Sequence, residues 1–286
     1  MTTLPTRVTH YARRRATGAA ILLAAMALVV VSLTPAQSLV AEHGPSKPPK
    51  PTIVLVHGSW ADGSSWNRVI ERLQDDGYKV AAIPNPLRSL SGDAASVRAY
   101  LESVTGPIVL VAHSYGGAVI TNAATGVANV KRLVYVNAFA PDAGQVPLDL
   151  AGPDSALATD PTTVFDFVPP TLPPGPTADV YLKRSTVFAS FATGLSSDAK
   201  AIVAATQRPA LLGAFAEASG APAWKTIPSW YLLGTEDQII PESAQRAMAE
   251  HAGSKIVEYD EPHLGLMTDP KTVTRVIERA AREAVR

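Results

Sequence analysis

Short, unbroken apolar runs that alternate with amphipathic segments constrain the fold of this chain more than any other feature. The first run, residues 52–56 (TIVLV), has no polar residue after its initial threonine. A strand buried on both faces of a parallel sheet has such a continuous apolar sequence, whereas a half-buried strand alternates apolar and polar residues. Five later segments also have the apolar character of strands, namely 80–83, 108–112, 133–137, 229–233 and 255–259. We therefore expect six strands.

Amphipathic segments separate these runs. Residues 65–73 repeat apolar side chains at helical spacing, and similar patterns occupy 93–104, 115–125, 242–251 and 270–285. Strands that alternate with helices form parallel sheets through right-handed crossovers. The chain has 286 residues, 47% of them hydrophobic, which is enough for one substantial core. The expected fold class is α/β, with a doubly wound, mostly parallel six-stranded sheet.

A long insertion interrupts the alternation between residues 140 and 223. It is rich in proline and alanine, residues 165–170 (FDFVPP) are not expected to continue a sheet, and 178–191 and 198–205 are expected to form short helices. This length exceeds that of an ordinary loop. Ligands in open α/β sheets bind outside the carboxyl ends of the strands, and the insertion leaves from such an end. We therefore predict a helical lid inserted after the fourth strand, with surface decoration as the alternative.

The beginning of the chain differs from the rest. Residues 1–36 contain four arginines, an apolar run over 19–31 and small residues at 34–36, which is the pattern of a secretory signal. An uncleaved membrane anchor is the alternative, although the run is shorter than the roughly 20 residues of a spanning helix. Residues 37–51 are proline-rich and polar, so we expect a tether before a domain over 52–286. The pattern predicts a secreted or envelope-associated protein with no membrane contact after cleavage.

Charge and cysteine content exclude several classes of site. Charged residues make up 17% of the chain and the formal net charge is zero. A nucleic-acid partner would need a basic stripe that neutralises phosphates, so none is expected. The chain has no cysteine, which excludes disulfides, thiol nucleophiles and thiolate metal sites.

A serine lies between the third expected strand and the helix that follows it. The segment 112–117 (AHSYGG) places Ser114 on that turn, with Ala112 two residues before it and Gly116 two residues after it. Strand and helix pack closely around such a turn, so both flanking positions need small residues, and the serine hydroxyl projects from the sheet. Glycine is usual at the first position, and Ala112 keeps it small. We predict that Ser114 is a nucleophile; the alternative is a serine that only caps the helix.

A second motif follows the first strand at residues 57–60 (HGSW). Acyl transfer requires backbone N–H groups that point at the oxyanion of the tetrahedral intermediate. We expect one of these N–H groups from Tyr115 and the other from Ser59, with Trp60 as the alternative. Gly58 allows a close approach of the backbone. We expect His57 to hold this loop in place rather than to act in catalysis.

The base that would activate Ser114 has to be a histidine. Of the six histidines, two precede the first strand and two lie inside the motifs above. His251 closes a helix, where it suits the negative end of the helix dipole. His263 follows the last expected strand in 261–265 (EPHLG), so a loop at the carboxyl end of that strand can bring its ring to Ser114. We predict His263 as the base.

A carboxylate is needed to orient that histidine. Asp237 and Glu236 both follow the strand 229–233, and we predict Asp237 as the acid. Asp142, after the strand 133–137, is a further alternative. The order Ser114, Asp237, His263 is the chain order of α/β-hydrolases and differs from that of chymotrypsin and subtilisin.

Together these segments resemble the α/β-hydrolase superfamily. The closer likeness is to the small lid-bearing esterases grouped with plant methylesterases and hydroxynitrile lyases, and to their actinobacterial relatives. The likeness extends from Thr52 to the C-terminus. The segments that carry it are 54–60 (VLVHGSW), 65–66 (SW), 109–117 (VLVAHSYGG) and 237–241 (DQIIP).

The resemblance implies roles for individual residues. It implies Ser114 as nucleophile, Asp237 as acid and His263 as base, with Ser59 and Tyr115 as oxyanion donors. Hydroxynitrile lyases of this type carry a lysine just after the acid, and residues 238–240 (QII) lack one. Dehalogenases on this fold have an aspartate at the position of Ser114. The missing lysine argues against hydroxynitrile lyase activity, and a serine in place of the aspartate argues against dehalogenase activity.

The expected activity is hydrolysis of carboxylic esters through an acyl-enzyme, without a metal or an organic cofactor. The insertion is predominantly apolar, which favours a small-molecule ester with a hydrophobic acyl or aryl group. Perhydrolysis of the haloperoxidase-like kind and C–C bond hydrolysis are alternatives on the same three residues. Two alternatives come from other classes: a ligand-binding or signalling protein with slow turnover, and a surface-anchored structural protein with a vestigial site.

Overall fold

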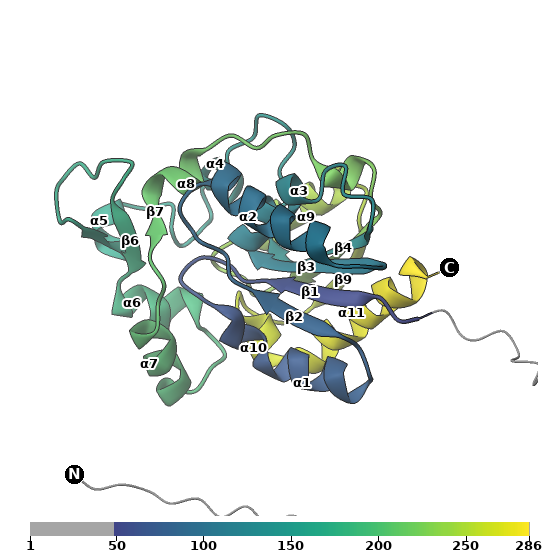
Figure 1. Cartoon of the computed structure of the whole chain (residues 1–286). Helices are drawn as coiled ribbons and strands as arrows, with labels where there is room; N and C mark the ends of the chain where they lie inside the picture. The colour runs from purple at the N-terminus through teal and green to yellow at the C-terminus, as the bar shows by residue number, and fades with distance from the viewer. Residues whose placement is uncertain (1–48, 286) are drawn as a thin grey trace, which may run out of the picture. The chain divides into compact units, whose positions relative to one another are not determined.

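A parallel six-stranded sheet forms the centre of the molecule (Figure 1). The computed structural model describes residues 49–285, so the predicted signal and residues 37–48 of the predicted tether lie outside the described residues. The sheet has the strand order β2-β1-β3-β4-β8-β9, and each neighbouring pair is parallel. Its strands are β1 (Thr52–Val56), β2 (Val80–Ile83), β3 (Ile108–Ser114), β4 (Val130–Ala138), β8 (Ser229–Gly234) and β9 (Lys255–Tyr259).

These strands confirm the six that were predicted. β3 lies near the middle of the sheet, between β1 and β4, and all of its residues are buried. Burial on both faces explains its continuous apolar sequence, because a polar side chain on either face would lose its hydration. Full burial of one such leucine or valine contributes roughly 1.5–3 kcal/mol to stability. The carboxyl end of β3 therefore has a rigid base.

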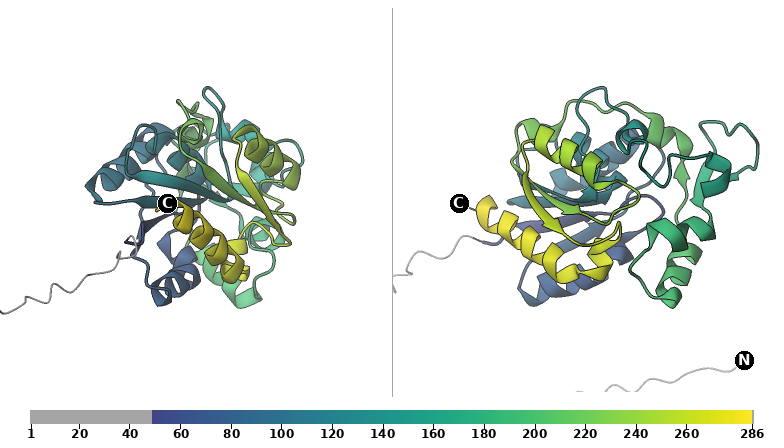
Figure 2. Two further views of the ribbon diagram at one scale, coloured as in Figure 1. Left: turned by 90° about the vertical axis from the view of Figure 1, so that its right-hand side faces the viewer. Right: turned by 180° about the vertical axis from the view of Figure 1, so that it is seen from behind.

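Helices cover both faces of the sheet (Figures 1 and 2). Helices α2, α3 and α9 lie on one face, and α1, α10 and α11 lie on the other. In α11 the buried residues Val273, Val276, Ile277 and Ala280 follow helical spacing, which gives that helix one apolar stripe against the sheet. The bounds are η1 (Gly63–Trp66), α1 (Asn67–Asp75), α2 (Leu90–Ser103), α3 (Tyr115–Ala123), α9 (Glu242–His251), α10 (Gly265–Thr268) and α11 (Pro270–Ala284).

Most of the chain between β4 and β8 lies at the carboxyl ends of the strands, with α5, α6, α7, β6 and β7 on the left in Figure 1. It forms both helices and a small antiparallel sheet with the order β5-β6-β7. The elements of this insertion are α4 (Pro147–Leu150), α5 (Pro161–Val164), β5 (Phe165–Val168), β6 (Asp179–Leu182), α6 (Arg184–Thr186), η2 (Val187–Phe191), α7 (Ser197–Ala205), β7 (Ala210–Leu211), α8 (Leu212–Ala216) and η3 (Ala223–Lys225).

The prediction of a purely helical insertion is wrong in two places. The segment 165–168 forms strand β5, because Pro169 and Pro170 end the strand without preventing it. The segment 179–182 forms strand β6 rather than helix, because Val180 and Leu182 are buried while their neighbours are partly exposed, a period of two. The helix expected at 198–205 is present as α7. No helix among residues 49–285 is both long and apolar enough to cross a membrane.

Candidate active site

Ser114 lies on a sharp turn between β3 and α3. Its backbone has φ 53° and ψ −129°, a conformation that non-glycine residues seldom adopt and that typically costs about 1–3 kcal/mol. A Cβ atom on Gly116 would lie 2.7 Å from the carbonyl oxygen of His57, and one on Gly58 would lie 2.6 Å from the Ser114 Cβ. The small residues around Ser114 are therefore required by backbone packing at the turn.

The structure brings together the three residues that the sequence singled out. The Ser114 hydroxyl is 3.1 Å from Nε2 of His263, and Nδ1 of His263 is 2.8 Å from Oδ2 of Asp237. The side chains of His263 and Asp237 are fully buried. With the proton on Nδ1, His263 donates to Asp237 and accepts from the serine hydroxyl. The three side chains form one hydrogen-bonded chain that ends at the nucleophile candidate.

The carboxylate of Asp237 is held by further donors. Its Oδ1 accepts the backbone N–H groups of Ile239 and Ile240, at 2.8 and 2.9 Å. Its Oδ2 also accepts the side-chain amides of Asn137, at 3.0 Å, and Gln245, at 3.2 Å. Hydrogen bonds to an ionised acceptor are stronger than those between neutral groups. These four donors therefore fix the carboxylate in the orientation that His263 uses.

Sequence reasoning missed Asn137 and Gln245. Asn137 ends the run 133–137 with φ 45°, and its Oδ1 accepts a hydrogen bond from the Tyr259 hydroxyl. A Cβ on Gly234 would lie 2.1 Å from the Asn137 amide nitrogen, so that glycine makes room for it. The sequence signal for Asn137 was weak: a polar residue ends an apolar run, but its left-handed backbone is seen only in the structure. Gln245 gave no comparable signal, because glutamine is ordinary in a helix such as α9.

The alternative acids lie elsewhere. Asp142 is paired with Lys225, at 2.7 Å, and with His251, at 2.9 Å. Hydrogen bonds from these two side chains hold the pKa of the Asp142 carboxyl well below its usual range. Glu236 is exposed on the turn before Asp237. Among the described residues, neither carboxylate forms a hydrogen bond or ion pair with His263.

The two histidines inside the motifs are buried and neutral. His57 donates from Nδ1 to the Gly58 carbonyl at 2.8 Å and accepts the Asn85 N–H at Nε2, at 2.9 Å. His113 donates from Nε2 to the backbone carbonyl of His263 at 2.8 Å. Burial lowers the pKa of His57 and lowers that of His113 well below its ordinary value. His57 thus holds its own loop, and His113 holds the backbone of His263.

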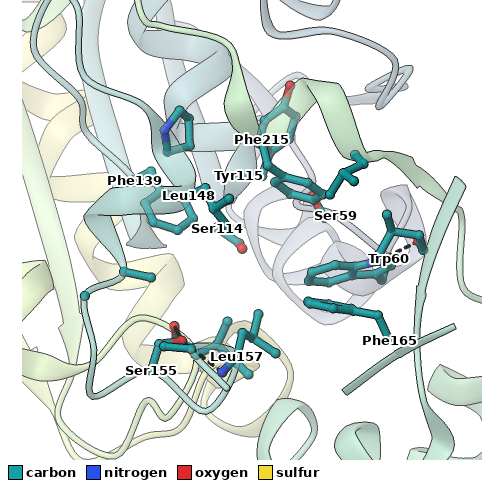
Figure 3. A pocket seen from close by; sticks show the side chains of 17 residues that line it. Ser59, Trp60, Ser114, Tyr115, Phe139, Leu148, Ser155, Leu157, Phe165 and Phe215 are labelled. Carbon is teal, nitrogen blue, oxygen red and sulfur yellow. Dashed lines mark hydrogen bonds between the residues drawn. The ribbon is translucent and has the colours of Figure 1, made fainter. Parts of the chain in front are cut away.

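A mostly apolar cavity of about 100 Å³ adjoins Ser114 (Figure 3). The Ser114 hydroxyl points toward the space in front of Trp60, whose ring lies 5.6 Å from that of Phe215 and 5.9 Å from that of Phe165. Both phenylalanines belong to the insertion, so the insertion forms part of the wall. The lining residues are Ser59, Trp60, Ser114, Tyr115, Phe139, Pro147, Leu148, Ala151, Gly152, Ser155, Leu157, Ala158, Phe165, Val180, Leu212, Phe215 and Ile239.

Ser59 and Tyr115 both border this cavity beside Ser114. The backbone N–H of Ser59 has no acceptor among residues 49–285. Tyr115 is the first residue of α3, and the first N–H groups of a helix have no intrahelical partner. The Tyr115 hydroxyl donates to the buried Asp93 at 3.0 Å, and burial raises the pKa of both groups. The structure therefore places the two expected donors together at the site.

The comparison with known families agrees with this arrangement. Residues 53–276 match the model of a family described as the alpha/beta hydrolase family. The chain belongs to this family. "Alpha/beta hydrolase nvfD" from Aspergillus novofumigatus is 27% identical over 258 residues, covering 82% of this chain and 98% of the relative. A "Carbendazim hydrolyzing esterase" from Nocardioides sp. is 33% identical over 104 residues, covering 32% of this chain and 43% of the relative.

A solved structure supports the expected resemblance at the level of the fold. The methylesterase MES16 from Arabidopsis superposes with a TM-score of 0.68 at 18% identity, covering 82% of this chain and 99% of MES16. The predicted likeness to the α/β-hydrolases grouped with plant methylesterases is thereby confirmed. At this level of identity the likeness extends to the fold alone.

Proposed function

We propose that this protein is a serine esterase that cleaves small carboxylic esters, with Ser114 as nucleophile, His263 as base and Asp237 as the acid that orients the base. One observation carries the proposal: the hydrogen-bonded chain from Ser114 through His263 to Asp237 ends at an apolar cavity. An isolated serine on a helix terminus would need neither a buried histidine nor a carboxylate with several donors. The membership of the alpha/beta hydrolase family and the esterase names of relatives add support.

The reaction proceeds in two steps. Nε2 of His263 takes the hydroxyl proton of Ser114 while Oγ attacks the ester carbonyl carbon, and the carbonyl electron pair moves to oxygen. The tetrahedral intermediate then expels the alcohol, which leaves with the proton from His263. Water then attacks the acyl-enzyme and gives a proton to His263. The second tetrahedral intermediate expels Oγ of Ser114, which takes that proton from His263, and the carboxylic acid is released. The carboxylate of Asp237 stabilises the imidazolium in both steps.

The N–H groups of Ser59 and Tyr115 would stabilise the oxyanion of both intermediates. Each donor that is in place before the reaction contributes about 2.7–4 kcal/mol in comparable enzymes. The turn at Ser114 supports this role, because it joins the nucleophile directly to the first N–H of α3.

The cavity favours a short hydrophobic acyl chain. Its volume of about 100 Å³ is below the roughly 150 Å³ of an engineered cavity that binds benzene. An aryl group would extend beyond this volume toward Leu148, which lines the cavity and is 55% exposed. The polar side chains of the wall are serines and one tyrosine, so a charged or sugar substrate would lose its hydration without compensation.

Export is a second part of the proposal. The arginines, apolar run and small residues of 1–36 support a cleaved signal and a site of action in the envelope or outside the cell. Expression of the full chain in a secreting bacterial host should give a mature protein that begins after residue 36 or close to it. Intact mass measurement on that protein checks this, and recovery of the full-length chain in the membrane fraction would indicate an anchor instead.

A fluorophosphonate probe tests the central proposal. The unmodified protein should be labelled at one serine and should hydrolyse short p-nitrophenyl esters with multiple turnovers, and Ser114→Ala should lose both properties. Ser155→Ala is the control, since Ser155 lies in the same cavity wall but donates to the Ile239 carbonyl at 2.7 Å. Labelling that survives in Ser114→Ala would refute the assignment. Faster peracid formation or diketone cleavage than ester hydrolysis would point to the alternative reactions.

A further inference from the structure

Phe191 of the insertion lies beside the candidate active site without lining its cavity. It ends the helical segment η2 (Val187–Phe191) and is 1% exposed. Its ring centroid is 5.2 Å from that of His263, with 51° between the ring planes. It is also 5.9 Å from the Trp60 ring, in an edge-to-face arrangement at 86°. Phe191 therefore contacts both the proposed base and the loop that carries the proposed oxyanion donor.

Two hydrogen bonds orient the His263 ring, one from Nδ1 to Asp237 and one between Nε2 and the Ser114 hydroxyl. Small rotations about χ1 and χ2 of His263 still change the direction of Nε2. Side chains that pack against the ring limit such rotations. Two rings supply this packing, His113 with centroids 4.7 Å from His263 and Phe191 at 5.2 Å. The angle at which Nε2 meets the serine hydroxyl thus depends on Phe191.

The second contact of Phe191 bears on the oxyanion loop. Trp60 directly follows Ser59, and its φ of 59° is rare for a residue with a large side chain. The Trp60 indole N–H donates to the carbonyl of Val180 in β6, at 2.9 Å. Phe191 and Val180 both belong to the insertion. The insertion therefore holds Trp60 in a conformation that the isolated loop would not favour. Because Ser59 directly precedes Trp60, a displacement of Trp60 would also move the Ser59 backbone.

We propose that Phe191 is a positioning residue: it orients His263 and Trp60 together and so sets the rate of the chemical step without touching substrate. This inference rests on the proposed function, since it needs His263 to act as base. It assigns the insertion a part in catalysis beyond covering the cavity. A displacement of reacting groups by about 1 Å can lower a rate by about 100-fold, so partial loss of this packing should be measurable.

The test is a pair of matched substitutions in the same helical segment. Phe191→Leu removes the aromatic faces next to His263 and Trp60. Phe188→Leu is the control, because Phe188 is half-buried and packs under the Arg184 guanidinium at 4.4 Å. With a short p-nitrophenyl ester, kcat of Phe191→Leu should fall about tenfold with KM within about twofold, whereas both constants should stay within about twofold in Phe188→Leu.

A second measurement separates positioning from product release and from folding. The rate of fluorophosphonate labelling at Ser114 should fall in Phe191→Leu by the same factor as kcat, because labelling needs the base but no deacylation. Thermal unfolding reports the folded fraction of each variant. If Phe191→Leu does not accumulate as folded protein, Phe191→Met, which is close in volume, takes its place.

The outcomes distinguish this inference from the proposed function. Unchanged kcat in Phe191→Leu, an effect on KM alone, or an equal loss in Phe188→Leu would overturn the positioning role while Ser114→Ala still abolishes activity. Activity that persists in Ser114→Ala would overturn the proposed function itself. A selective loss of kcat and of labelling rate in Phe191→Leu would support the positioning role.

Discussion

Two buried neutral histidines should make the folded state sensitive to mild acid. Burial lowers the pKa of His57 and, more strongly, that of His113, from the ordinary value of 6.5. The hydrogen bonds of each ring also suit its neutral form. Nε2 of His57 accepts a hydrogen bond and so carries no proton, and Nδ1 of His113 has no partner among the described residues that could accept a proton from it. Protonation of either ring in the folded state would place a charge where burial opposes it.

The sign and size of the effect follow from proton linkage. Below pH 6.5 the unfolded chain binds protons at both positions, whereas the folded chain does not until the lowered pKa values are reached. Stability therefore falls as pH falls below 6.5. Between pH 6.5 and the strongly lowered pKa of His113, that histidine contributes a slope of about 1.4 kcal/mol per pH unit. The lowered pKa of His57 adds a smaller loss of the same sign. Domains typically have about 5–15 kcal/mol of total stability, so the loss over one or two pH units is large.

Glutamine substitutions isolate this contribution. The side-chain amide of His113→Gln can still donate to the His263 carbonyl but does not titrate, and His57→Gln can accept the Asn85 N–H through its amide oxygen. Urea unfolding at a series of pH values from about 5 to about 8 gives the slope of the free energy of unfolding. His113→Gln should lose about 1.4 kcal/mol per pH unit from the slope below pH 6.5, and His57→Gln should lose a smaller amount of the same sign.

The contributions of other titrating groups to the pH dependence of stability cancel when the slopes of two variants are compared. The buried Asp93 has a raised pKa and acts with the opposite sign, because the folded state then binds its proton more readily than the unfolded state. Its contribution is the same in the unmodified protein and in both histidine variants, so the difference between slopes reports the histidine alone. Equal slopes in the unmodified protein and His113→Gln would refute the reasoning.

Two further predictions concern the site and the turn around it. Asp237→Asn should lower turnover by about 10⁴-fold, as the loss of the correct histidine tautomer does in trypsin-like enzymes, while circular dichroism stays native; a near-normal rate would assign the acid elsewhere. Gly117→Ala should destabilise the protein by about 1–3 kcal/mol or prevent folding, because its Cβ would lie 2.3 Å from the Phe139 carbonyl oxygen. Gly175→Ala is the control, because the added methyl group has open space around it, and it should match the unmodified protein in thermal unfolding. Equal stability of Gly117→Ala and Gly175→Ala would contradict the packing argument.

The sequence by itself determined the sheet and the turn at Ser114. A strand buried on both faces, such as β3, needs a continuous apolar sequence whatever surrounds it, so six runs predicted six strands. Ser114 was found for a similar reason, because the strand, the small flanking residues and the start of the helix that mark its turn are contiguous in the sequence. The sequence also placed Asp237 and His263 after separate strands, and the shared edge of a parallel sheet brings such loops together.

Only the tertiary structure showed that Asp237, rather than Glu236 or Asp142, is hydrogen-bonded to His263, because sequence order does not show where a loop side chain points. The same holds for Asn137 and Phe191, whose partners are more than 70 residues away. The strand at 179–182 was missed because four residues with a period of two are a weak local signal. It forms where β5 and β7 supply the missing hydrogen bonds, and contacts so distant in sequence exist only once the chain has folded.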